Sequence, residues 1–122
     1  KDNCFSIYSQ AFTDGQHYSY NLENIFIYYK EYEKLMSHFK KIIPQFIYDL
    51  EYEELVKNKE TSIKKLLEFC DLKFEKNCIN FHKNKRNVTT PSSSQVRRKI
   101  YKTSIEKYKN YPEYEREASL KL

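Results

Sequence analysis

The chain has 122 residues, of which 39% are hydrophobic and 32% charged, so it can form one domain with a modest core. No apolar run approaches the roughly 18 residues that a membrane-spanning helix needs, and no secretory segment follows Lys1. These absences favour the cytoplasm. Because the first residue is not Met, we expect the chain to be an excised part of a longer protein.

The first twelve residues predict a short amphipathic helix. Apolar side chains recur there at spacings of three and four, at Cys4, Phe5, Tyr8, Ala11 and Phe12. The same spacing predicts that Ser6 and Gln10 lie one turn apart on one face.

The longest predicted helix begins after Asn21, whose side chain is a good N-cap, and it cannot continue past Pro44. Its apolar stripe extends from Ile25 to Ile43 and includes Tyr28, Tyr29, Tyr32, Leu35, Met36 and Phe39. A stripe of this kind is more typical of a core than of a cofactor site, so we expect it to be buried.

One strand is predicted over residues 45–50, where Phe46, Tyr48 and Leu50 alternate with the other side chains. A single strand leaves its backbone donors and acceptors unpaired. We therefore expect the rest of its sheet to lie outside this chain.

Shorter helices are predicted over 51–56, after Asn58 and over 74–81, with Cys70 and Cys78 facing inward. The two cysteines and His82 lack both a C-x-x-C pair and a fourth ligand, so we predict reduced thiols and no metal site. A further helix over 104–110 is expected to end at Pro112, before an acidic tail.

Positive charge is concentrated in residues 83–109, which hold nine Lys/Arg and only one acid, a local charge of +8. Since the whole chain carries +5, everything else sums to −3. Hydroxyls, guanidinium groups, ammonium groups and aromatic rings together suit a phosphorylated aromatic ligand such as a nucleotide. The alternative is a solvated charged loop without a ligand.

The motifs of the chain read, in order, DLEYEELV, IKKLLEFCDL, CINFHKNKRNVTTPSSSQVRRKIYKTS and YKNY. In this order they resemble the C-terminal half of sulfotransferases, closest to the protein-tyrosine sulfotransferase-like group, whose bacterial members often carry tetratricopeptide repeats. The resemblance implies an α/β, P-loop-like parent fold, of which residues 1–122 are the C-terminal part, mostly α-helical with one short strand. It also implies transfer of a sulfuryl group from 3′-phosphoadenosine 5′-phosphosulfate to an acceptor hydroxyl, without a metal.

The resemblance assigns roles to particular residues. Ser6 matches the serine that holds the 3′-phosphate, Tyr52 a tyrosine that lines the nucleotide, and Lys107 a lysine on its phosphate side. Residues 92–101 match the segment that covers the nucleotide. The implied donor-binding set is Ser6, Tyr52, Ser92, Ser93, Gln95, Val96, Arg98, Tyr101, Lys102 and Lys107. The catalytic base and the phosphosulfate-binding loop are expected upstream of Lys1.

Three positions depart from the family's pattern. Gln10 stands where tyrosylprotein members have a basic residue, Lys99 replaces a frequent proline and Tyr108 a frequent tryptophan. The implied partners are the nucleotide donor and a hydroxyl acceptor, which could be a protein tyrosine, a carbohydrate or a small phenol. Two other functions stay open, a module that binds RNA or another polyanion and a non-catalytic helical interaction module.

Overall fold

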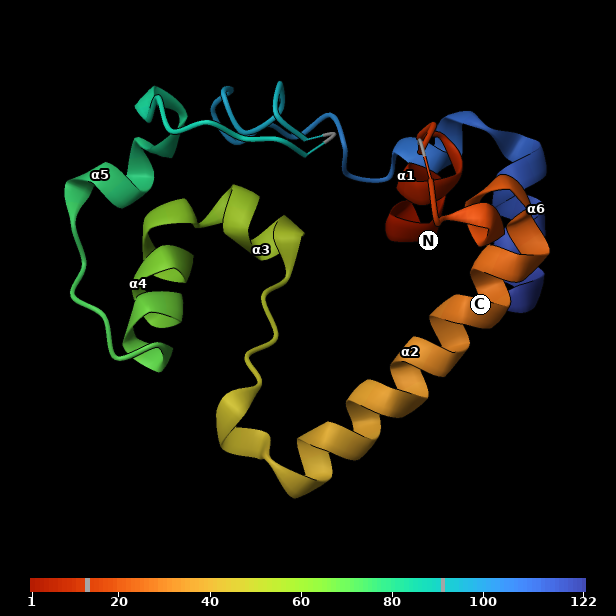
Figure 1. Ribbon diagram of the computed structural model, residues 1–122, viewed down its shortest axis with the longest axis horizontal. Coiled ribbons are helices and arrows are strands. Elements are labelled where there is room, and N and C mark those ends of the chain that lie inside the picture. The colour runs from red at the N-terminus through yellow and green to blue at the C-terminus, as the bar shows by residue number, and fades with distance from the viewer. Residues whose placement is uncertain (13, 91) are drawn as a thin grey trace. The chain divides into compact units, whose positions relative to one another are not determined.

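The computed structural model describes residues 1–12, 14–90 and 92–122, and helices predominate among them (Figure 1). The α-helices are α1 (Asp2–Tyr8), α2 (Leu22–Ile42), α3 (Tyr52–Lys57), α4 (Lys59–Phe69), α5 (Lys76–Ile79) and α6 (Pro112–Lys121). Single 3₁₀ turns form η1 (His17–Tyr20), η2 (Pro44–Phe46), η3 (Phe81–Lys83) and η4 (Lys107–Asn110). The prediction of a mostly helical chain is confirmed.

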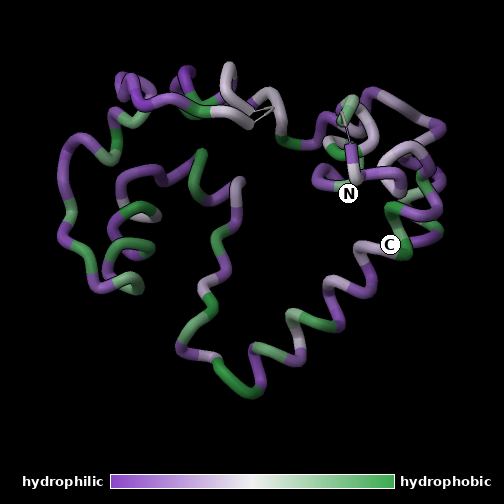
Figure 2. Tube along the Cα trace, in the orientation of Figure 1, coloured by the Kyte–Doolittle hydropathy of each residue, from purple (hydrophilic) through white to green (hydrophobic). Residues whose placement is uncertain are grey.

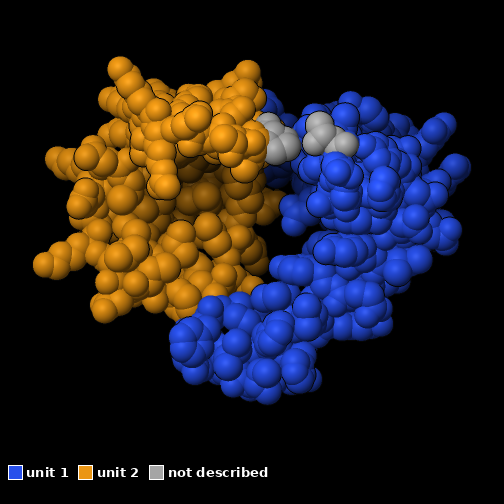
Figure 3. All heavy atoms as spheres, viewed as in Figure 1, with its two compact units in different colours: residues 1–47, 103–122 blue, residues 48–102 orange. Residues whose placement is uncertain are grey.

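The chain divides into two compact units, which we describe separately. Unit 1 comprises residues 1–47 and 103–122, and unit 2 comprises residues 48–102 (Figure 3). No helix in the described ranges is both long and apolar enough to cross a membrane.

The predicted strand over 45–50 is wrong, because no strand occurs among the described residues. The segment begins with the 3₁₀ turn η2, in which Phe46 N–H donates to the carbonyl of Ile43 at 3.0 Å. Proline suits the first position of a helical turn, so Pro44 favours this local solution. Ile47 then takes an extended conformation, but an extended segment becomes a strand only when a second one pairs with it.

Helix α1 is shorter than predicted, because it ends at Tyr8. The Ser9 hydroxyl donates to the carbonyl of Ser6 at 3.2 Å, and local hydrogen bonds of this kind compete with helix continuation. Cys4 and Phe5 are buried as expected, whereas Tyr8 is exposed. Gln10 lies beyond the helix, so the predicted one-turn spacing from Ser6 does not hold.

Both predicted limits of α2 are confirmed. Asn21 accepts a hydrogen bond from the Asn24 amide at 3.0 Å, and the helix stops just before Pro44. The prediction that its whole stripe is buried is wrong, since only its beginning is enclosed, at Ile25 and Phe26. Tyr32 and Leu35, further along, are 50% and 52% exposed. Figure 2 shows apolar and hydrophilic positions alternating along this helix.

The core of unit 1 joins three helices that are distant in sequence. Its buried residues are Cys4 and Phe5 of α1, Ile25 and Phe26 of α2, and Tyr114 and Ala118 of α6. The acidic tail expected after Pro112 is therefore wrong, because this segment is helix α6. Proline at the first helical position and glutamates in the first turn favour a helix start. The predicted helix over 104–110 is reduced to the 3₁₀ turn η4.

Unit 2 is built on α3 and α4, which pack against each other. Both helices begin where the sequence predicts, although the Asn58 side chain donates to the Glu54 carboxylate at 2.8 Å instead of capping α4. Cys70 was expected inside but is exposed, because α4 ends at Phe69 and Asp71 turns the chain with a φ of 55°. Cys78 is half-buried.

Candidate functional site

The ten residues implied as donor-binding divide between the two units. Ser6 and Lys107 belong to unit 1, and the remaining eight, between Tyr52 and Lys102, belong to unit 2. Each group has its own geometry.

In unit 1, Lys107 lies against the helix that carries Ser6. The Lys107 ammonium is 5.8 Å from the centre of the Phe5 ring, and Phe5 directly precedes Ser6 in α1. A cation over an aromatic face at this distance is an attractive contact. The Ser6 side chain is exposed, and no hydrogen bond joins it to Lys107 among the described residues. The structure thus places the lysine beside α1 and leaves the serine hydroxyl accessible.

A carboxylate that the sequence did not single out holds the backbone on both sides of Lys107. Asp2 accepts a 2.7 Å hydrogen bond from the amide of Glu106 and a longer, 3.5 Å contact from the amide of Tyr108. More than one hundred residues separate these partners, so no spacing signal could have revealed them. Asp2 is therefore part of the surroundings of the candidate phosphate site.

In unit 2, residues 92–98 form tight turns. The carbonyl of Ser92 accepts hydrogen bonds from the amides of Gln95 (2.9 Å) and Val96 (3.0 Å), and Gln95 accepts from Arg98 (3.0 Å). These bonds use backbone groups only. The side chains of Ser92, Ser93, Gln95, Arg98 and Lys102 are exposed, whereas Val96 and Tyr101 are half-buried. The loop consequently presents hydroxyl, amide and cationic groups to solvent.

One hydrogen bond ties this loop to α3. The hydroxyl of Tyr52 donates to the carbonyl of Tyr101 at 2.9 Å, across 49 positions of sequence. Burial, with a smaller contribution from the Tyr101 side chain, raises the pKa of Tyr52 above its ordinary value. The structure therefore brings together two residues that the sequence assigned to the same ligand.

The two adjacent arginines of the loop have different surroundings. The guanidinium of Arg97 donates to the carbonyl of Arg86 and so fixes the loop from within. Arg98, like Lys102, has no hydrogen bond or ion pair from its side chain within the described part of the chain. Of these arginines, only Arg98 offers its charged group to a ligand.

Positive charges from several parts of unit 2 act on His82. Burial lowers the pKa of His82 below its usual value, and the positive charges of Lys99, Lys83 and Lys59 lower it further. Lysines far apart in sequence therefore act on one point. An anion would be stabilised in such surroundings.

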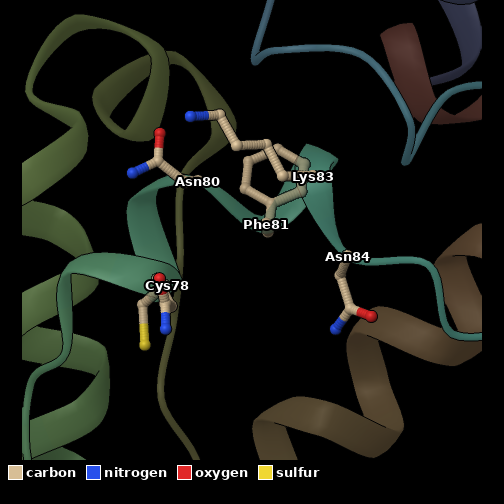
Figure 4. A pocket seen from close by; sticks show the side chains of 6 residues that line it. Cys78, Asn80, Phe81, Lys83 and Asn84 are labelled. Atoms are coloured by element: carbon tan, nitrogen blue, oxygen red, sulfur yellow. The ribbon is translucent and has the colours of Figure 1, made fainter.

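A separate hollow of about 520 Å³ opens on unit 2 (Figure 4). Its lining is Asn77, Cys78, Asn80, Phe81, Lys83 and Asn84, which includes none of the implied donor-binding residues. Its one charged side chain is that of Lys83, so it contains no acid–base pair. Among the described residues no cluster of three or more His, Cys, Asp or Glu could hold a metal ion.

Comparison with known proteins identifies the family. The family model described as "Sulfotransferase family" matches residues 1–76, more than half of the chain. The chain belongs to the sulfotransferase family. The matched range contains Ser6 and Tyr52 but stops before residues 92–101 and Lys107. The family has a P-loop-like parent fold, of which this chain contributes helices.

One relative from Aquifex aeolicus (strain VF5), described as an uncharacterized protein, is 40% identical over 84 residues. This alignment covers 69% of the present chain but only 11% of the relative's length. No solved structure matches the chain.

Proposed function

We propose that the protein carrying this chain transfers a sulfuryl group from 3′-phosphoadenosine 5′-phosphosulfate to an acceptor hydroxyl, and that this chain binds the nucleotide part of the donor. Family membership supports the reaction class. The observation that carries the assignment to this chain is the hydrogen bond from Tyr52 to Tyr101. This bond holds residues 92–101, the basic loop, to α3, whose Tyr52 is the implied nucleotide-lining tyrosine.

The exposed groups of unit 2 match the chemistry of a nucleotide. Hydroxyls of Ser92 and Ser93 can donate to phosphate oxygens, and the charges of Arg98 and Lys102 strengthen such bonds. Tyr52 is 37% exposed, so part of its ring can cover a base. Gln95, Val96 and Tyr101 complete the proposed contacts of the loop.

In unit 1 the proposed ligand is the 3′-phosphate. A hydroxyl at Ser6 and an ammonium at Lys107 are groups that a phosphate accepts hydrogen bonds from. Lys107 has no carboxylate paired with it in the described residues, so its charge is available for an anion.

The proposed reaction breaks the bond between sulfur and the bridging oxygen of the donor and forms a bond between sulfur and the acceptor oxygen. Adenosine 3′,5′-bisphosphate leaves with the electron pair, and the acceptor proton passes to a base. We assign no base to this chain. Its cations stabilise the charge of the leaving bisphosphate, and its loop holds the donor in place.

A protein tyrosine is the acceptor we propose, because the motif order is closest to the tyrosylprotein group. Incubation of the full-length protein with sulfur-labelled donor and a tyrosine-containing acidic peptide tests this. Label on the peptide supports the proposal, and label on a carbohydrate or small phenol alone contradicts the acceptor. No transfer to any hydroxyl, with RNA binding that weakens steeply in salt, would favour the polyanion-binding alternative.

A further inference from the structure

The Asp2 carboxylate contacts the backbone immediately before and immediately after Lys107. The amide of Glu106 lies 2.7 Å from one carboxylate oxygen, and the amide of Tyr108 lies 3.5 Å from the other. Hydrogen bonds to an ionised acceptor are among the stronger ones in proteins. Asp2 therefore restrains the segment in which Lys107 is the central residue.

The backbone around Lys107 needs this restraint, because the residue before it has an unfavourable conformation. Glu106 has a φ of 55°, the left-handed region that residues with a Cβ seldom adopt. This residue turns the chain into η4, which begins at Lys107. The hydrogen bond from its amide to Asp2 holds that turn, and it leaves the Lys107 ammonium over Phe5.

We propose that Asp2 is a positioning residue for Lys107, keeping its ammonium beside the helix that carries Ser6. Asp2 itself does not contact the nucleotide sulfate donor. The identity of the anion that Lys107 binds, the 3′-phosphate, rests on the proposed function, whereas the restraint on η4 does not.

The direction in which anion affinity changes when the Asp2 carboxylate is removed distinguishes a positioning role from a purely electrostatic effect. A carboxylate close to an anion site repels the anion, so its removal should strengthen binding if charge alone matters. If Asp2 acts by holding Lys107, its removal should weaken binding. Unit 1 has other contacts between the first residues of the chain and α6, including a 2.7 Å hydrogen bond from the Tyr114 hydroxyl to the carbonyl of Lys1, which precedes α1. We expect these contacts to keep the two segments together when Asp2 is changed.

The test uses Asp2→Ala and Asp2→Asn in the full-length protein. Glu117→Gln is the control, because it removes the same charge from an exposed position of α6 without a hydrogen bond in the described residues. Hydrogen exchange is followed at the amides of Glu106 and Tyr108, with Phe26 reporting on the core. Asp2→Ala should accelerate exchange at 106 and 108 about ten-fold and leave Phe26 unchanged.

Calorimetry with adenosine 3′,5′-bisphosphate and adenosine 5′-monophosphate completes the test. We expect Asp2→Ala to weaken bisphosphate binding about ten-fold with little effect on the monophosphate, and Asp2→Asn, which keeps one acceptor oxygen, to weaken it less. Glu117→Gln should change neither.

Unchanged exchange at 106 and 108, or tighter bisphosphate binding by Asp2→Ala, overturns the proposal. A wild-type protein that binds neither nucleotide contradicts the proposed function instead. In that case hydrogen exchange alone tests the role of Asp2, and faster exchange at the amides of 106 and 108 in Asp2→Ala supports the restraint on η4.

Discussion

The hydroxyl of Tyr52, on α3, donates a 2.9 Å hydrogen bond to the backbone carbonyl of Tyr101, at the end of the basic loop. Both residues belong to unit 2, and the bond closes a stretch of 49 residues. The hydroxyl therefore holds the loop, while the partly exposed ring remains available to a base.

These two roles of Tyr52 can be separated by substitution. Tyr52→Phe keeps the ring and removes a hydrogen bond of about 1 kcal/mol, so it should loosen the loop and weaken donor binding a few-fold. Tyr52→Ala also removes the ring, so it should weaken donor binding more than Tyr52→Phe does. Because the side chain is 37% exposed, Tyr52→Ala should cost less than the roughly 3–5 kcal/mol typical of a core aromatic.

Trypsin provides the readout for the loop, since Arg98 and Lys99 are exposed cleavage sites. Faster nicking of Tyr52→Phe than of wild type is expected, with cleavage after the exposed Lys40 of unit 1 as the internal control. Equal nicking rates, or a melting temperature that falls while donor affinity is kept, would make Tyr52 a purely structural aromatic.

Lys107 and Ser6 should act together on one phosphate. Loss of a charge-assisted hydrogen bond costs about 1.5–3 kcal/mol, so Lys107→Ala should raise the donor dissociation constant about ten- to a hundred-fold. Groups that share one ligand are not additive, so the Ser6→Ala and Lys107→Ala effects should couple in a double-mutant cycle. Additive effects on donor affinity would show that the two side chains bind different groups.

Tyr114 should make unit 1 sensitive to alkali. Burial raises the pKa of its hydroxyl above the ordinary value, because the charged phenolate is disfavoured in the core. A group with a raised folded pKa stabilises fully below the unfolded pKa of about 10, and this stability is lost as pH rises through the folded value. We therefore expect the free energy of unfolding to fall above about pH 10.

Tyr114→Phe is the matched variant for this prediction. It keeps the ring contact with Phe5, at 5.1 Å between centroids, and removes the hydroxyl that donates to Lys1. Its unfolding free energy should be about 1 kcal/mol lower near neutral pH and should decline less in alkali. An identical alkaline decline in both proteins would assign the effect to other groups.

Local signals in the sequence predicted the local features of the fold. Asn21 and Pro44 mark the limits of α2 through chemistry confined to a few neighbouring residues, and both limits are confirmed. The strand over 45–50 depended on pairing with a distant segment, which alternation cannot reveal. The core positions of Tyr114 and Ala118 were not predicted, because the surrounding glutamates suggested a solvated tail. Their one-turn spacing and the proline before them were signals of a helix.

The same difference between local signals and contacts across distant segments applies to the candidate site. Motif order indicated Tyr52 and the loop near Tyr101, and the structure joins them. Motif order could not distinguish Arg97, whose guanidinium donates to a backbone carbonyl, from Arg98, whose side chain has no hydrogen bond among the described residues. Nor could it reveal Asp2, whose partners lie at the other end of the chain.

Calorimetry on the full-length protein tests most directly whether it binds a nucleotide bearing a 3′-phosphate. Adenosine 3′,5′-bisphosphate should bind at least about ten-fold more tightly than adenosine 5′-monophosphate, since the extra phosphate gains charge-assisted hydrogen bonds. Equal affinity for the two nucleotides would contradict the account.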